Sequence, residues 1–109
     1  MMRKEMQACI DACMACINAC NVCFDACLRE EHIKMMAGCI RLDRECADIC
    51  ALAVKAMQAN SPFTKDICNL CATICQACGE ECQKHDHDHC QKCADACFKC
   101  ADACQTMAA

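Results

Sequence analysis

The spacing of the cysteines constrains the fold of this chain more than any other feature. The chain has 109 residues and 19 cysteines, and sixteen of these follow one another at intervals of three and four residues in three segments. The three series are Cys9, Cys13, Cys16, Cys20, Cys23 and Cys27; Cys68, Cys71, Cys75, Cys78 and Cys82; and Cys90, Cys93, Cys97, Cys100 and Cys104. Such spacing places side chains along one stripe of an α-helix, whereas a strand would need a period of two. The pattern therefore predicts helices that pack through cysteine stripes.

The residues around the stripes agree with amphipathic helices. In the first segment, the positions opposite the cysteines are the polar residues Asp11, Asn18 and Asp25. A sparser series of Cys39, Cys46 and Cys50 indicates one more helix, between the first two cysteine-rich segments. Its stripe holds Asp43 between Cys39 and Cys46, and the sequence offers no physical reason for a carboxylate among thiols.

Four helices are expected, at residues 3–29, 33–59, 62–84 and 88–107. Ser61 can cap the third helix, and Pro62 suits its first turn. Asp86 or Asp88 is the expected N-cap of the fourth helix. Short connections make neighbouring helices antiparallel. We therefore predict an all-α chain with a single domain over residues 1–109, an antiparallel up-down-up-down four-helix bundle with a cysteine-lined core.

Composition and charge exclude several functional classes. The formal net charge is −4 and no basic patch is present, which argues against nucleic acid as a partner. No run approaches about 18 consecutive apolar residues, so we expect no membrane span. The first residues are followed by no apolar run of the signal-peptide type, which predicts a cytoplasmic protein with reduced thiols. The odd number of cysteines, with only two Gly and one Pro, also argues against a disulfide scaffold.

The cysteine spacing favours a metal over disulfides. Side chains three or four residues apart on a helix have Cβ atoms about 5–6 Å apart, and a disulfide needs about 3.5–4.5 Å. Thiolates select Cu(I), Zn(II) or iron–sulfur clusters. One Cu(I) neutralises one thiolate, whereas an isolated zinc ion on four thiolates leaves two buried negative charges. Iron–sulfur clusters use discrete sets of four cysteines. Many Cu(I) ions are thus the expected cargo.

These cysteine series, as in CIDACMACINACNVCFDAC and CNLCATICQACGEEC, resemble those of the bacterial copper storage proteins of the cytosolic branch. The resemblance covers essentially the whole chain. It implies a four-helix bundle filled with many Cu(I) ions that are bound by thiolates within and between helices. It also implies a homotetramer and a metal-binding role for all nineteen cysteines, Cys39, Cys46 and Cys50 included.

The two ends of the predicted bundle differ. Met2, Met6, Met57 and Met107 extend the stripes at one end, where we expect the methionines mainly to pack. The other end carries His32, Met36, His85, His87 and His89. Imidazole is a competent copper ligand. We therefore predict that His85, His87 and His89 form a mouth through which copper passes inward. The alternative is that this segment is only a solvated turn.

The stripe is repetitive and lacks a unique set of nucleophile, base and orienting group, so the chain is not expected to be an enzyme. Storage or buffering of Cu(I) is the favoured function. A copper chaperone or a small thiol is the candidate donor of the copper ions. Three alternatives remain at this stage: a zinc or mixed-metal sink, a thiol–disulfide redox protein that uses its CxxC pairs, and a plain structural bundle.

Overall fold

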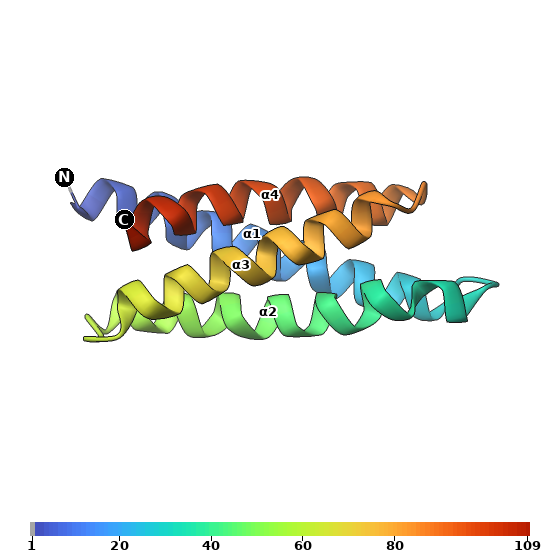
Figure 1. Cartoon of the computed structure of the whole chain (residues 1–109), viewed down its shortest axis with the longest axis horizontal. Helices are drawn as coiled ribbons and strands as arrows, with labels where there is room; N and C mark the ends of the chain where they lie inside the picture. Colours follow the sequence, from blue (N-terminus) through green and yellow to red (C-terminus); the bar gives the residue numbers. More distant parts are fainter. Residues whose placement is uncertain (1) are drawn as a thin grey trace.

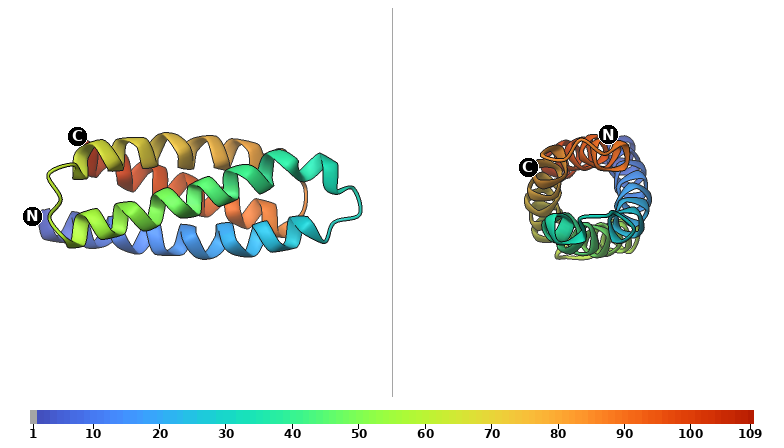
Figure 2. Two further views of the ribbon diagram at one scale, coloured as in Figure 1. Left: turned by 90° about the horizontal axis from the view of Figure 1, so that it is seen from below. Right: turned by 90° about the vertical axis from the view of Figure 1, so that its right-hand side faces the viewer.

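The computed structural model describes residues 2–109, with the side chains from residue 4 onward. Four long helices run antiparallel to their neighbours: α1 (Met2–Leu28), α2 (Ala37–Gln58), α3 (Thr64–Gln83) and α4 (Asp88–Ala108). They form a rod of 46 × 18 × 17 Å with both termini at the same end (Figure 1). Figure 2 shows the four helices as a ring when viewed along the rod. The predicted four-helix bundle is thus confirmed.

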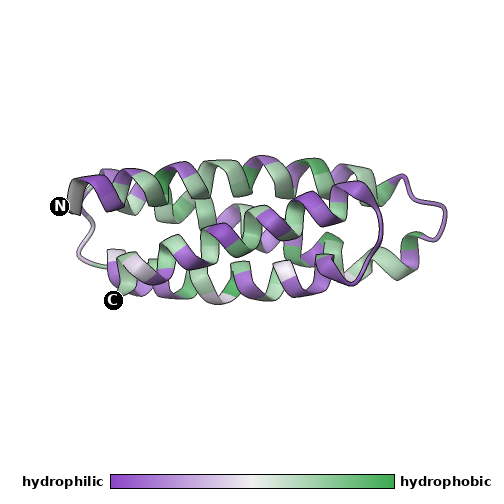
Figure 3. Cartoon of the chain, turned by 90° about the horizontal axis from the view of Figure 1, so that it is seen from above, coloured by the Kyte–Doolittle hydropathy of each residue, from purple (hydrophilic) through white to green (hydrophobic). Residues whose placement is uncertain are grey.

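The core of the bundle consists mainly of cysteine. All nineteen cysteines have an exposed fraction of 0%, and they form one continuous cluster with small residues such as Ala47, Ala53 and Ala101. Partly buried Ile10, Ile17 and other apolar side chains pack around this cluster. In Figure 3, hydrophilic residues recur along every helix, in agreement with the amphipathic pattern. The larger apolar side chains therefore seal a core that thiols fill.

The helix boundaries correct three predictions at the connections. The second helix does not start as an α-helix at residue 33, because a 3-10 helix, η1 (Ile33–Met36), comes before α2. The third helix starts at Thr64 instead of residue 62, because Ser61 Oγ accepts a hydrogen bond from Phe63 N (3.1 Å) within a preceding turn. Phe63 is the N-cap residue of α3, and its side chain makes no capping hydrogen bond.

The expected aspartate cap of the fourth helix is also wrong. The N-cap of α4 is His87, whose side chain makes no capping hydrogen bond, and Asp88 is the first helical residue. The His87 carbonyl instead accepts hydrogen bonds from the backbone of Cys90 (3.0 Å) and Gln91 (3.1 Å). Asp88 still suits this place electrostatically, because a carboxylate in the first turn complements the helix dipole.

The end of α2 has a well-defined local cause. Asn60 adopts a positive φ of 53°, and Ser61 N donates to Ala56 O at 2.9 Å. This hydrogen bond and the left-handed Asn form a Schellman-type C-terminus. The turn reverses the chain at the end of the rod where both termini lie.

Helix α1 is long and apolar enough, by length and composition, to cross a membrane over Lys4–Leu28, with a mean hydropathy of 1.3. Its six cysteines are fully buried inside the bundle, and Asp11, Asn18 and Asp25 are exposed. A bundle core helix meets the same criterion, so this hydropathy is weak support for a membrane span.

Candidate metal centre

The thiols of the core are free and close together. None of the nineteen cysteines forms a disulfide. Most of the sulfurs lie 3.5 to 4.0 Å from another sulfur, either on the same helix or on another helix. These distances are far longer than the S–S bond of a disulfide, which is about 2.0 Å. They suit sulfurs that share a metal ion.

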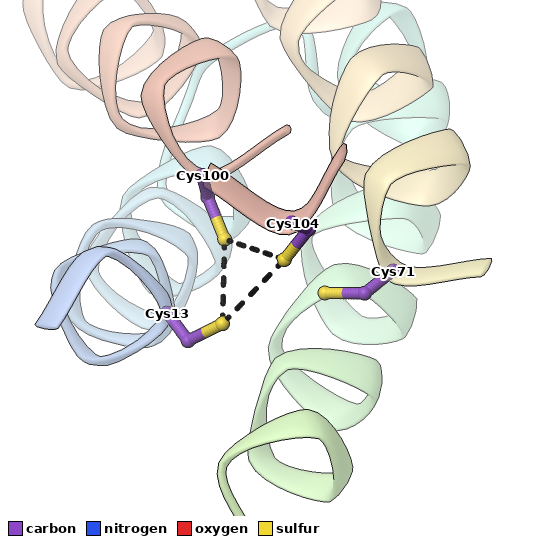
Figure 4. A group of neighbouring side chains, drawn as sticks. All are labelled: Cys13, Cys71, Cys100 and Cys104. Carbon is purple, nitrogen blue, oxygen red and sulfur yellow. Dashed lines mark hydrogen bonds between the residues drawn. The ribbon is translucent and has the colours of Figure 1, made fainter. Parts of the chain in front are cut away.

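Three of these sulfurs outline a trigonal site near the end of the bundle that holds the termini. Cys13 Sγ lies 3.6 Å from Cys100 Sγ and 3.8 Å from Cys104 Sγ, and the third edge of the triangle is 3.9 Å. Figure 4 shows the three side chains converging from α1 and α4, with Cys71 on the opposite side. The centre of such a triangle is about 2.2 Å from each corner, close to the metal–thiolate bond of about 2.3 Å in zinc sites. A soft ion fits there without a change in the backbone.

Further triangles share corners with one another. The sulfurs of Cys16, Cys20 and Cys97 lie 3.7 to 3.9 Å apart. The Cys20–Cys97 edge belongs also to a triangle with Cys93, whose sulfur is 3.7 Å from Cys20 and 3.9 Å from Cys97. Cys46 extends the network at 3.5 Å from Cys16. Because sites share sulfurs, the core can hold linked clusters of monovalent ions bridged by thiolates.

At the histidine end of the bundle, an imidazole nitrogen lies among thiols. His89 Nδ1 lies 3.4 Å from Cys23 Sγ and 3.6 Å from Cys90 Sγ. Together with Cys27, these groups offer four ligand atoms that all lie within 4.8 Å of one another. The His89 side chain is only 16% exposed. Of the three histidines predicted as ligands, His89 is the one that reaches the thiol core.

The other two histidines lie beside carboxylates. His87 stacks on His89 with ring centroids 5.4 Å apart, and its side chain is 44% exposed. His85 Nε2 lies 3.3 Å from Glu81 Oε2. His85 and His87 line a cavity of 310 Å³ whose wall also contains His32, Met35, Met36, Glu30 and Glu31. At this end of the bundle, the His87 imidazole thus lies at the surface and the His89 imidazole lies next to the thiol core.

The methionines at the opposite end pack as expected. Met57 and Met107 are buried, and Met6 is partly buried against the core. The predicted position of Met2 in the stripe falls outside the described side chains. At the histidine end, Met36 is buried as well.

Asp43, which the sequence leaves unexplained, is fully buried among thiols. Its Oδ1 accepts hydrogen bonds from the thiols of Cys78 (3.4 Å), Cys82 (3.5 Å) and Cys93 (3.3 Å). Its Oδ2 has no hydrogen-bond partner among the residues that the structure describes. Burial, followed by the nearby Cys93 and Cys78 thiols, raises the pKa of this carboxyl to about 10. Among protonated thiols, Asp43 is therefore a neutral acid at pH 7.

Sequence reasoning missed two glutamates at the histidine end. Glu30 Oε2 lies 2.8 Å from His89 Nε2 and 3.5 Å from His87 Nδ1. Glu81 lies beside His85 in the same way. Glu81 is four residues before His85 on one helix, so helical spacing could have indicated that pair. No sequence signal connects Glu30 with His89, because 59 residues separate them.

Burial also bears on the alternative functions. A thiol–disulfide enzyme needs a thiolate that a substrate can reach. Every cysteine here is fully buried, and α-helices replace the βαβ context of thioredoxin-like CxxC motifs. The redox alternative is therefore disfavoured.

Comparison with known proteins agrees with this geometry. Residues 2–109 match the family described as "copper storage protein". The chain is 69% identical to apo copper storage protein 3 of Bacillus subtilis, over 94% of this chain and 98% of that chain, with a TM-score of 0.91. It is 67% identical to the Cu(I)-bound copper storage protein BsCsp3, over 96% of this chain and 99% of that chain, with a TM-score of 0.92.

A more distant solved structure has the same fold. A cytosolic copper storage protein from Streptomyces lividans, in a structure with five coppers, is 40% identical over 98% of this chain and 94% of that chain, with a TM-score of 0.93. An uncharacterized cysteine-rich protein of Bacillus subtilis is 66% identical over 73 residues, which are 67% of this chain and 68% of that protein. The family match over nearly the whole chain and the buried thiol network together show that this chain belongs to the copper storage protein family.

Proposed function

We propose that this chain stores many Cu(I) ions on the thiolates of its bundle core. The observation that carries the proposal is the core of nineteen buried, free thiols, in which most sulfurs lie 3.5 to 4.0 Å from another sulfur. The Cu(I)-bound relative BsCsp3 supports copper as the cargo. Each Cu(I) neutralises one thiolate, so a filled core avoids the high cost of uncompensated buried charge.

The proposed ligands are all nineteen cysteines, with histidines added at one end. The complete set comprises Cys9, Cys13, Cys16, Cys20, Cys23, Cys27, Cys39, Cys46, Cys50, Cys68, Cys71, Cys75, Cys78, Cys82, Cys90, Cys93, Cys97, Cys100, Cys104, His85, His87 and His89. Loading proceeds by thiolate exchange, in which an ion passes between neighbouring sulfurs and protons leave the thiols. Storage needs no turnover, so we infer a role without catalysis.

Titration of the reduced protein with Cu(I) under anaerobic conditions tests storage directly. We expect saturation at a number of ions close to the number of thiols. Saturation at one or two ions would reject storage. Competition between Cu(I) and Zn(II) tests copper as the cargo, because a copper store should keep its Cu(I) when excess Zn(II) is added.

We also infer that the histidine end is the mouth for copper. The stepwise exposure of the histidines supports this, with His87 outside, His89 inside and Cys23 next to His89. Replacement of His85, His87 and His89 together by Ala should slow uptake and leave the total capacity nearly unchanged. A matched control replaces three exposed α3 residues, Asp66, Asn69 and Thr73, by Ala. Equal uptake rates in both variants would contradict the mouth.

The assembly, location and donor are further parts of the proposal. The family match over residues 2–109 supports a single domain, and the cytosolic relative from Streptomyces supports a cytoplasmic location. A homotetramer follows from the family resemblance, and analytical ultracentrifugation at several concentrations tests it. A copper chaperone or a small thiol would deliver the ion, and transfer from each purified donor identifies which of them does so.

A further inference from the structure

Glu30 lies where it can control the imidazole that reaches the thiol core. It follows the end of α1, in the connection to η1, and its side chain is 26% exposed. Its Oε2 lies 2.8 Å from His89 Nε2. The ionised carboxylate can only accept, so Nε2 of His89 must carry the proton of this hydrogen bond.

This hydrogen bond decides what His89 presents to the core. With the proton on Nε2, a neutral His89 has its lone pair on Nδ1, which lies 3.4 Å from Cys23 Sγ and 3.6 Å from Cys90 Sγ. In the other tautomer, an N–H would face the thiols and the lone pair would face the carboxylate. An incoming ion can bind only the nitrogen that carries the lone pair.

A second contact, with His87, is made to the face of the His89 ring. His87 stacks on His89 with an interplanar angle of 3°, and His87 Nδ1 is 3.5 Å from the same Glu30 oxygen. The carboxylate therefore joins the outer imidazole to the inner one. Glu45, on α2, is exposed and does not line the cavity at the histidine end, so it provides a control position of the same charge.

We propose that Glu30 is a positioning residue of the copper entrance, which fixes His89 with Nδ1 aimed at the Cys23, Cys27 and Cys90 thiols. A carboxylate that accepts the other ring proton of a ligating histidine sets both its tautomer and its orientation, and loss of such a group typically weakens metal binding about 10- to 100-fold. The inference rests on the proposed storage function.

The experiment compares Glu30→Ala, Glu30→Gln and Glu45→Ala in the reduced, copper-free protein. Nitrogen-15 NMR at pH 8 reports the tautomer of each histidine, and His89→Ala identifies the His89 signals. Stopped-flow uptake from the Cu(I) complex of bicinchoninic acid measures the rate, and a full titration measures the capacity. Far-UV circular dichroism confirms that each variant is folded.

We expect Glu30→Ala to raise the population of the Nδ1–H tautomer of His89 and to take up the first copper about tenfold more slowly, at unchanged capacity. The side-chain oxygen of Gln still accepts from Nε2–H, so Glu30→Gln should retain the tautomer and most of the rate. Glu45→Ala should behave as the wild type.

Three results would overturn the inference. One is an unchanged His89 tautomer in Glu30→Ala, whatever its rate. The second is an altered tautomer with an unchanged rate. The third is a Glu30→Gln variant as slow as Glu30→Ala, which would assign the effect to negative charge. A wild-type capacity of one or two ions would instead reject storage itself, so the two failures are distinguishable.

Discussion

Replacement of Asp43 by Asn should remove a strong pH dependence from the stability of the copper-free protein. The Asp43 carboxyl is fully buried, and three thiols donate to its Oδ1. Its pKa is raised to about 10, with burial as the largest cause. In the unfolded chain, an aspartate has a pKa of about 3.9. The folded protein therefore retains a proton that the unfolded chain releases.

The sign and the size of the effect follow from this difference. The contribution of Asp43 to stability is fully present below about pH 4, and it is lost as pH rises toward 10, because the unfolded state gains by ionising. The loss amounts to about 3 kcal/mol between pH 5 and 7.5. Asn cannot ionise, and its side-chain oxygen can still accept from the thiols.

Urea unfolding of the reduced, copper-free protein at pH 5.0 and 7.5 measures this effect. The free energy of unfolding of the wild type should fall, relative to the Asn variant, by about the calculated amount. Asp48→Asn on the same helix is the control, because this side chain is 76% exposed. Equal changes with pH in the wild type and in Asp43→Asn would refute a neutral buried carboxyl.

Three further predictions concern packing, protons and capacity. A Cβ at Gly79 would lie 2.6 Å from the Phe98 ring, so Gly79→Ala should lower the free energy of unfolding by about 1–3 kcal/mol. Gly38→Ala meets only the flexible Glu81 side chain and should be less costly, which urea unfolding of both variants checks. Burial raises the pKa of the Cys27 and Cys68 thiols to about 11, so copper must displace protons. Its apparent affinity, measured against a chelator, should therefore rise by about tenfold per pH unit for each proton displaced, and a flat profile would contradict this. Cys13→Ala removes one corner of the triangle with Cys100 and Cys104, so saturating copper should fall by about one ion, whereas Met14→Ala should leave it unchanged.

Local sequence rules predicted the helices better than their ends. The four segments and their cysteine stripes follow from helical spacing alone. The capping predictions at Ser61, Asp86 and Asp88 failed, because several backbone arrangements can satisfy the free N–H groups of a first turn. The 3-10 helix before α2 was also missed, because no Gly or Pro marks that connection.

The sequence by itself determined that the cysteines share one face of each helix, because the helical repeat of 3.6 residues fixes the direction of every side chain. It also determined the thiol chemistry, and with it the preference for a soft metal. Only the tertiary structure decided which sulfurs meet, as in the triangle of Cys13, Cys100 and Cys104. It also placed Asp43 beside Cys93, and Glu30 beside His89, across 50 and 59 residues of sequence. Such contacts depend on the rotation and axial shift of one helix against another, which packing sets and spacing along a single helix does not contain.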